Sequence, residues 1–260
     1  KDFIKEIKSR KIERVHRRAK YIMMDLSGGL PGRKEGKTLV IHQKISGHLL
    51  YGEWKLKDGR WKSEEPGPIR DDPFNRHIRF ILKLSNGKML GLADLRRFGK
   101  VYLGDTKTIE HVNDIDKLGP EPLDPGFRVT DLAKILSRKK GYVKKVLMDP
   151  FVLAGVGNIY GDEILWYAGI HPLKRVEKLS AADIKNIFKY MRFVLTKAIK
   201  AKGDSKQDFR RLRGEFGGYQ KMHKAYQLTG KPCQKKDKGI IERVVINARS
   251  AHFCPVHQTL

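Results

Sequence analysis

Residues 155–158 read Gly-Val-Gly-Asn and lie between two segments with helical periodicity. Glycine has no Cβ, so its backbone can come close to a large ligand. The backbone N–H groups that start the second helix, together with the helix dipole, form a binding site for an anion such as a phosphate. Asn158 can cap this helix or donate its side-chain amide to the phosphate, and Lys144 and Lys145 add positive charge. The same residues also fit an ordinary helical hairpin in which glycine serves packing alone.

The charge of the chain favours the phosphate interpretation. Its 260 residues include 55 Lys and Arg against 29 Asp and Glu, a net charge of +26. A globular protein with this imbalance repels itself unless a polyanion is present, so nucleic acid is the expected partner. A solvated basic surface, as in a ribosomal protein, is the alternative, and an anionic membrane surface is a weaker one.

Composition also indicates a cellular setting. No apolar run is long enough to cross a bilayer, and we expect neither a membrane segment nor a signal peptide. The chain has two cysteines, Cys233 and Cys254, too few for a disulfide-stapled secreted fold of this length. A reducing, cytoplasmic location is therefore expected.

The first part of the chain is rich in β-type segments. Short apolar runs separated by turn residues predict strands over 20–26, 37–45, 48–54, 77–85 and 88–94. Ser-Asn-Gly-Lys at 85–88 predicts a hairpin with a type I′ turn, because Asn-Gly accommodates two positive φ angles. Strands at this spacing predict an antiparallel β-sandwich or barrel.

After a break in the pattern, the period becomes helical. Apolar residues at i, i+3 and i+4 predict helices over 130–140, 141–149, 158–169 and 180–203, with a capping box at Ser180 and Asp183. The polar segment 203–219 is expected to be a mobile loop. The fold class is therefore α+β, and we predict a β-sandwich over 1–105, a linker over 106–128, a helical domain over 129–225 and a β-hairpin carrying the cysteines over 226–260.

Six segments resemble the motifs of one known family, in order and at similar spacing. They are RRAKY (17–21), HQKISG (42–47), DLRRFG (94–99), GVGNIY (155–160), GDSKQDF (203–209) and RSAHFCPVHQ (249–258). These segments are similar to those of the formamidopyrimidine-DNA glycosylase and endonuclease VIII family, and the resemblance covers essentially the whole chain. It implies a β-sandwich lobe, a helix–two-turn–helix DNA-binding domain and a C-terminal zinc-finger-like β-hairpin.

The resemblance also implies roles for residues that contact the DNA backbone. Lys20 matches a catalytic lysine on a β-hairpin that touches the backbone at the lesion and assists base release. Asn158 matches a residue that grips phosphate, with Lys144 close to it. Arg249 matches an arginine that holds the phosphates flanking the flipped nucleotide. From its residue type alone, Lys20 would be a solvated surface cation.

Three residues match a wedge that enters the duplex when a base is extruded. Arg96 and Phe98 match two of its members, and Ile45 stands where the family has Met. A guanidinium and a flat apolar ring can fill the unstacked gap that the flipped base leaves. Without the resemblance, Phe98 would be interpreted as a core aromatic. Arg-Arg-Phe-Gly favours the formamidopyrimidine branch, and therefore oxidised purines as substrates.

The expected metal site departs from the family's four-cysteine zinc finger. Cys233 and Cys254 are kept, Lys236 replaces the second cysteine and His257 replaces the fourth. An ammonium is not a zinc ligand, so a fourth donor would have to come from His252 or Asp237. Alternatively, the hairpin folds around its Val-Val-Ile segment without a metal.

The family's nucleophile is an N-terminal proline followed by glutamate, whereas this chain begins Lys1-Asp2. The resemblance implies that roughly three dozen residues precede Lys1 in the complete protein, and that a proline amine there forms the iminium that drives β-elimination.

These patterns predict a bifunctional repair enzyme. It would remove oxidised purines, such as 8-oxoguanine and formamidopyrimidines, from double-stranded DNA containing damaged bases and then nick the strand, with 203–219 closing over the extruded base. We expect a monomer in the cytoplasm, associated with the nucleoid. The alternatives are a non-catalytic DNA-binding protein on the same scaffold and a ribosomal or RNA-binding protein.

Overall fold

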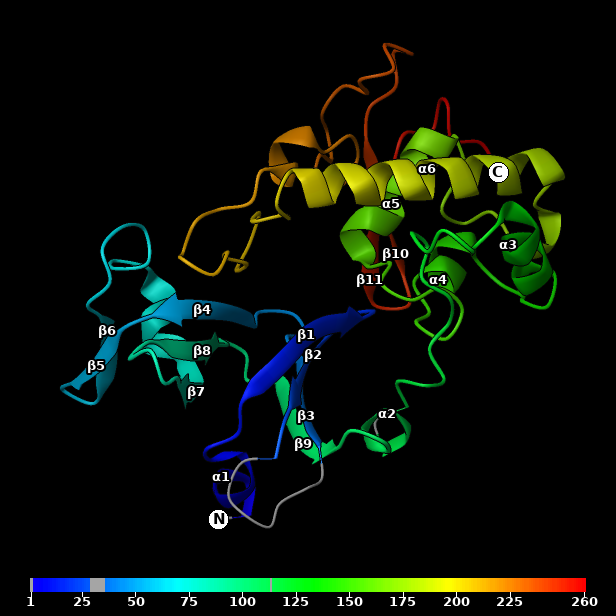
Figure 1. Ribbon diagram of the computed structural model, residues 1–260. Helices are drawn as coiled ribbons and strands as arrows, with labels where there is room; N and C mark the ends of the chain where they lie inside the picture. The colour runs from blue at the N-terminus through cyan, green and yellow to red at the C-terminus, as the bar shows by residue number, and fades with distance from the viewer. Residues whose placement is uncertain (1, 29–35, 113) are drawn as a thin grey trace. The chain divides into compact units, whose positions relative to one another are not determined.

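The chain forms two compact units, shown in the ribbon of a computed structural model that describes residues 2–28, 36–112 and 114–260 (Figure 1). The first unit comprises Lys1–Lys117 and Lys202–Gly218, and the second comprises Leu118–Ala201 and Tyr219–Leu260. Each unit is described by itself. Among the described residues, no helix combines the length and the apolar character needed to cross a bilayer.

The first unit is built from antiparallel strands. A short helix, α1 (Asp2–Ile7), precedes a sheet with the strand order β1-β2-β3-β9, and a second sheet has the order β4-β8-β7. The strands are β1 (Ile12–Arg18), β2 (Tyr21–Leu26), β3 (Lys37–His42), β4 (His48–Gly52), β7 (Ile78–Lys83), β8 (Met89–Ala93) and β9 (Lys100–Asp105), with a hairpin of β5 (Trp54–Lys57) and β6 (Arg60–Ser63), a 3-10 turn η1 (Pro73–His77) and the short helix α2 (Ile109–Val112).

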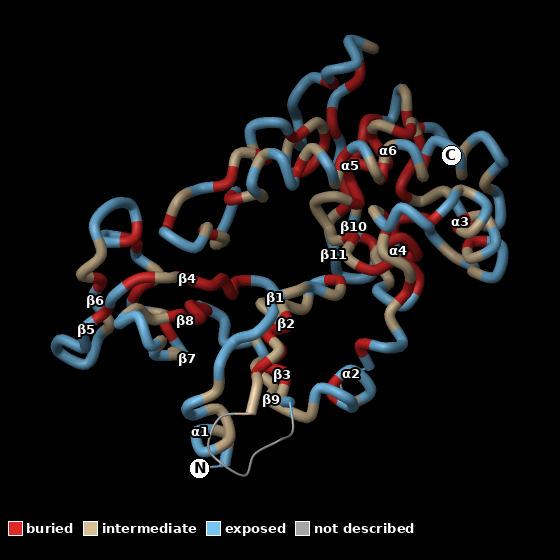
Figure 2. Tube along the Cα trace, viewed as in Figure 1, coloured by how far each residue is buried: buried red, intermediate tan, exposed pale blue. Residues whose placement is uncertain are grey.

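The two sheets pack face to face, as the β-sandwich prediction requires. Leu39 and Ile41 of β3 share one core cluster with Leu49 of β4 and Leu92 of β8. Strands β2, β3 and β9 of the first sheet and β4, β7 and β8 of the second contribute side chains to this core. Strands β4 and β8 are buried along almost their whole length (Figure 2). The other face of the second sheet is covered by a cluster around Trp54.

The hairpin at 85–88 forms, but its turn is not type I′. Leu84 N donates to Lys88 O at 2.9 Å, which leaves a three-residue loop between β7 and β8. Gly87 has a φ of 81°, whereas Asn86 is not among the residues with positive φ. A three-residue loop with one left-handed glycine is the other common hairpin connection. The Asn-Gly signal therefore predicted the hairpin correctly and its turn type incorrectly.

The second unit combines helices with a C-terminal hairpin. Its elements are α3 (Val129–Leu136), α4 (Val143–Leu147), α5 (Asn158–Ala168), η2 (Val176–Lys178), α6 (Ala181–Lys200), η3 (Tyr219–Met222), β10 (Glu242–Ile246) and β11 (Arg249–Phe253). Helix α5 is buried almost all round and packs against α6 and β11. The predicted capping box is confirmed, since Ser180 Oγ accepts from Asp183 N at 3.1 Å and Asp183 accepts from Ser180 N.

The structure groups several segments differently from the predicted domains. Residues 106–117 belong with the sandwich and 118–128 with the helices, so 106–128 is divided between the units. The 226–260 hairpin shares a unit with the helices. Most of the expected mobile loop, Lys202–Gly218, clusters with the sandwich through specific contacts. At the start of the described chain, α1 ends at Ile7 and β1 begins at Ile12.

Candidate nucleic-acid interface

One end of the first sheet carries Lys20 and the two loops that hold the predicted wedge residues, 43–47 and 94–99, here called the wedge loops. Lys20 lies in the tight turn between β1 and β2, and the next residue, Tyr21, pairs with His42 at the end of β3. His42 in turn pairs with Lys100 at the start of β9. The loop that carries Ile45 leaves β3 at this end, and the loop that carries Arg96 and Phe98 enters β9 here. Strand register therefore places the predicted residues of this unit together.

The two wedge loops are tied to each other by a buried hydrogen-bond network. Ser46 Oγ donates to Asp94 Oδ1 at 2.5 Å, and Arg96 N donates to Ser46 Oγ at 2.9 Å. The other carboxylate oxygen, Asp94 Oδ2, accepts from Gly99 N at 2.6 Å. Ser46 and Asp94 are both buried, so these bonds hold the loops without competition from water.

The backbone of both loops is tightly turned. Arg97 has a φ of 59° and Lys44 a φ of 56°, in the left-handed region that non-glycine residues seldom adopt. A Cβ on Gly47 would lie 2.3 Å from Gln43 O, so only glycine fits there. This frame leaves apolar side chains in solvent: Ile45 is 60% exposed and Phe98 is 55% exposed. Because Phe98 is itself exposed, it is not the core aromatic of the alternative interpretation. Arg96 is exposed as well.

Lys20 lies in a strongly cationic environment. It is exposed at the turn, where Ala19 has a φ of 52°. The neighbouring His42 ring contacts Tyr21 edge to face at 4.6 Å, and His42 Nδ1 accepts from Lys44 N at 2.9 Å. Burial, with the positive charges of Lys44 and Lys20, lowers the pKa of His42 to about 4. His42 is therefore a neutral acceptor at neutral pH.

In the second unit, the Gly-Val-Gly-Asn segment starts α5 as expected. Gly155 has a φ of 94°, and Gly157 is the N-cap residue, so Asn158 is the first helical residue and does not cap the helix. The Oδ1 atom of Asn158 is buried without a hydrogen-bond partner among the described residues. Such an atom is costly unless a ligand or water satisfies it. Because Oδ1 is an acceptor, a water or a donor group would satisfy it, whereas a phosphate could be bound only through the Nδ2 amide, the donor of the predicted role.

Lys144 is buried in an ion pair. Its Nζ lies 2.6 Å from Asp162 Oδ1 and donates to Ser250 O at 2.5 Å. The other oxygen, Asp162 Oδ2, accepts from His252 N at 3.0 Å and faces His252 Nδ1 at 2.8 Å. Burial lowers the pKa of Lys144, while Asp162 opposes the shift. Lys144 thus joins α4 and α5 to β11 beside Arg249, and His252 is occupied away from the cysteines.

Arg249 is exposed at the start of β11, at the end of a tight hairpin. Ile246 pairs with Arg249, and the two intervening residues, Asn247 and Ala248, have φ angles of 48° and 60°. Two successive positive φ angles are those of the type I′ turn that was predicted elsewhere. A pocket of about 460 Å³ adjoins this tip, and its lining includes the basic side chains Lys139, Lys140, Lys145 and Arg249.

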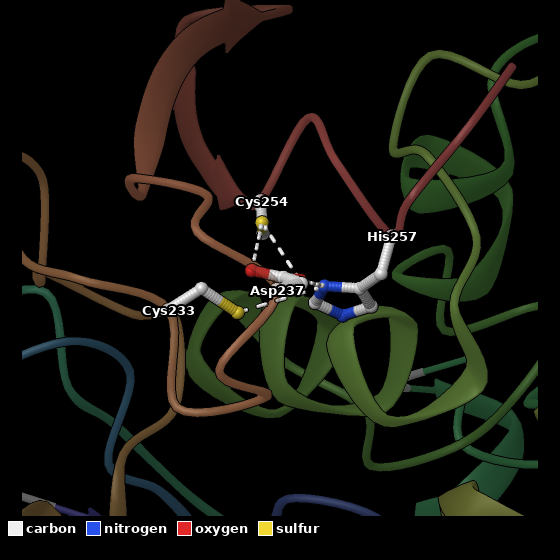
Figure 3. Close-up of side chains that lie close together, drawn as sticks. All are labelled: Cys233, Asp237, Cys254 and His257. Carbon is white, nitrogen blue, oxygen red and sulfur yellow. Dashed lines mark hydrogen bonds and ion pairs between the residues drawn. The ribbon is translucent and has the colours of Figure 1, made fainter.

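Four side chains converge to form a candidate metal centre (Figure 3). Cys233, Asp237, Cys254 and His257 offer ligand atoms that all lie within 4.8 Å of one another. His257 Nε2 donates to Trp166 O at 3.1 Å, which directs Nδ1 toward Asp237 Oδ2, 2.7 Å away. This donor set fits a zinc ion, because zinc-bound histidines usually donate their second N–H to a carbonyl or carboxylate. Of the two candidate fourth donors, Asp237 lies in this cluster and His252 does not.

Sequence reasoning missed the residues that hold the predicted ones in place. Ser46 and Asp94 lie inside quoted motifs but were assigned no role, and Asp162 was not identified. The sequence offered part of the signal, because Ser46 and Asp162 each stand next to a glycine. Short polar side chains in such positions often form hydrogen bonds that fix a loop. The partner of each could not be read from sequence, because the paired residues are far apart along the chain.

The chain matches family models for two domains of the same enzyme. Residues 1–101 match the formamidopyrimidine-DNA glycosylase N-terminal domain, and residues 118–210 match the H2TH domain of the same glycosylase. The formamidopyrimidine-DNA glycosylase of Herpetosiphon aurantiacus is 37% identical over 98% of this chain and 84% of its own length. That of Chloroflexus aggregans is 36% identical over 100% of this chain and 85% of its own length.

Solved structures agree with these matches. A complex of the Lactococcus lactis Fpg protein with DNA containing an abasic site has a TM-score of 0.82 and 27% identity, covering 100% of this chain and 86% of the other. The MutM (Fpg) protein of Thermus thermophilus has a TM-score of 0.77 and 31% identity, covering 96% and 83%. With domain matches, relatives above 30% identity and the same fold in agreement, the chain belongs to the formamidopyrimidine-DNA glycosylase family.

Proposed function

We propose that this chain removes oxidised purines from duplex DNA and then cleaves the strand at the resulting abasic site. The observation that carries this function is that the turn with Lys20 and the two loops with Ile45, Arg96 and Phe98 lie at the same end of the sandwich sheet. Exposed apolar side chains on a rigid cationic frame suit insertion into a base stack, and they have no packing role in the sandwich.

The wedge accounts for extrusion of the damaged base. A duplex that loses one base from its stack has a gap as thick as an aromatic ring, and Phe98 and Ile45 offer apolar surface to fill it. Arg96 supplies donors for the orphaned partner base. The buried Ser46–Asp94 bond keeps both loops in register, so little ordering is needed when DNA binds.

The second unit supplies phosphate contacts. Asn158 stands at the start of α5, where first-turn N–H groups have no intrahelical partner and the dipole favours an anion. Arg249 projects from a hairpin whose tight turn fixes its direction. Lys144 acts through position, since its buried pair with Asp162 fixes the strand on which Arg249 lies. These contacts are independent of sequence and depend on salt.

The lyase chemistry needs an amine close to the sugar. In the family pattern, a proline amine attacks C1′, the base leaves, and the iminium acidifies the C2′ proton whose loss expels the 3′ phosphate. We assign the exposed Lys20, at the hairpin turn, to a contact with the DNA backbone at the lesion, where its positive charge assists departure of the base.

We also propose that zinc is held by Cys233, Asp237, Cys254 and His257. The ion would bridge segments before and after the hairpin and so fix β10 and β11 on Trp166, against which His257 packs at 5.2 Å between ring centroids. The protein is proposed to act as a monomer in the cytoplasm, on nucleoid DNA.

The deciding experiment is incubation of the full-length protein with a duplex containing one 8-oxoguanine. We expect strand cleavage at the lesion, seen on a denaturing gel, and a covalent adduct when borohydride is added. An undamaged duplex is the control. Tight binding to the damaged duplex without cleavage or adduct would support the non-catalytic alternative instead.

Phosphate contacts are tested separately by salt titration with an abasic-site duplex. Arg249→Ala should reduce the slope of log affinity against log salt by about 1, and Asn158→Ala should weaken binding about tenfold or more. Lys62→Ala, in the exposed β6 strand, is the control. If both variants bind as tightly as the unmodified protein at every salt concentration, the assignment of Arg249 and Asn158 to phosphate contacts is wrong.

A further inference from the structure

The segment Lys202–Gly218, here called the docked loop, connects α6 to η3 of the second unit but clusters with the sandwich. At its centre, Arg210 is buried. An arginine is seldom buried unless its charge is paired and its donors are satisfied. A docked arginine in a polar, glycine-containing loop therefore calls for a specific partner.

That partner is Asp72, which precedes η1. Arg210 Nε lies 3.1 Å from Asp72 Oδ2, and the two side chains are 9% and 3% exposed. The guanidinium lies between two rings, 4.1 Å from the centroid of Phe216 in the loop and 5.0 Å from that of Phe74 in the sandwich. Arg210 Nη1 also donates to Phe209 O at 3.0 Å. The planar guanidinium suits this combination of stacking and pairing, whereas lysine could not reproduce it.

Asp72 is itself fixed within the sandwich. Its Oδ1 accepts from Phe74 N at 2.8 Å and caps η1, which leaves Oδ2 for Arg210. Phe74 packs edge to face against the buried His48 ring at 5.0 Å. The socket for Arg210 is therefore built from residues that the sandwich already orders.

Backbone contacts hold the rest of the docked loop. Tyr51 N donates to Leu212 O at 2.6 Å, which extends the edge of β4. Gly214 has a φ of 83°, and a Cβ there would lie 2.7 Å from the Ile69 backbone, so the loop lies directly on that chain. Loop residues Phe209 and Leu212 form one wall of a pocket of about 860 Å³ in this unit.

We propose that Arg210 and Asp72 form a latch that positions the docked loop for recognition of the extruded base. Both are positioning residues, since neither is assigned a contact with DNA. The inference rests on the proposed function, in which this loop covers the damaged base. It predicts that the latch matters for base release and not for steps in which the base is already absent.

The test compares two substrates for Arg210→Met and Asp72→Asn in the full-length protein. Asp72→Asn keeps an oxygen for the η1 cap and removes the charge. On an 8-oxoguanine duplex, single-turnover base release should fall about 100-fold in each variant, as expected when a recognising group is displaced by about an ångström. On a duplex with a preformed abasic site, binding and strand cleavage should stay within about threefold of the unmodified protein.

A second readout does not depend on activity. Tryptic cleavage after the exposed Arg213, followed by mass spectrometry, should accelerate at least about tenfold in both variants because the loop is released. Lys88→Met is the matched control: it removes an ion pair with Glu53 and Glu65 in the same unit and should change neither readout.

Two results would overturn the latch. One is unchanged cleavage at Arg213 together with unchanged base release. The other is an equal loss on both substrates, which would mean general destabilisation. If the unmodified protein acts on neither substrate, the proposed function fails; the proteolysis result still decides whether the loop is latched.

Discussion

The buried pair of Lys144 and Asp162 allows a quantitative test of how the phosphate-binding surface is held. The side chains are 2% and 0% exposed, and Nζ and Oδ1 lie 2.6 Å apart. Lys144→Met leaves the Asp162 carboxylate buried, with His252 as its remaining partner among the described residues. Removing one member of a buried pair costs about 3–5 kcal/mol, a large share of a typical total stability of about 5–15 kcal/mol.

Replacing both members should be far less harmful. Lys144→Met combined with Asp162→Asn removes both charges, and such replacements of a whole buried pair are often close to neutral. The double variant should therefore lose less unfolding free energy than the sum of the losses in the two single variants, by at least about 2 kcal/mol. Lys174→Met is the control: Lys174 pairs with Asp183, both side chains are partly exposed, and its loss should cost about 1 kcal/mol or less.

Hydrogen exchange of the α5 amides is the appropriate measurement, because it reports on the second unit alone. Salt-dependent binding to an abasic duplex is the companion measurement. If Lys144 acts by fixing β11, the double variant should recover affinity together with stability. Additive penalties in the double variant, or a Lys144→Met variant of unchanged stability, would refute the reasoning.

Three further predictions concern single positions. Gly47→Ala should displace the Ile45 loop, because the new Cβ would meet Gln43 O at 2.3 Å, and should weaken abasic-duplex binding about tenfold without loss of the sandwich fold seen by circular dichroism. Asp237→Ala should lower zinc content well below about one ion per chain in elemental analysis, and a greater loss in His252→Gln would contradict the assigned donors. His42 has a pKa of about 4 in the folded chain and about 6.5 when unfolded. Its contribution to the free energy of unfolding should therefore be complete above pH 6.5 and fall by at most about 3 kcal/mol as the pH drops to 4. Urea unfolding measured against pH tests this, and an equal pH dependence in His42→Gln would rule it out.

Much of the architecture was predictable because local patterns encode it. Short apolar runs between turn residues predicted β2, β3, β4, β7 and β8, and the helical period predicted α3 to α6, with bounds within about four residues of the observed ones. These signals are strong because each element must bury apolar side chains. The strand β1 was missed, since its residues are mostly polar and exposed and form no apolar run.

The sequence alone determined the fold class, the excess of positive charge and the identity of the residues in the quoted motifs. The tertiary structure decided which of them meet. Asp237 clusters with the cysteines, whereas His252 pairs with Asp162. The expected mobile loop docks on the sandwich through the pair of Arg210 and Asp72, which are 138 positions apart in the chain. Strand register brings Lys20 to both wedge loops in the same way. The physical reason is that a buried charge or donor must find a partner, and that partner is set by folding over long chain separations rather than by local propensity.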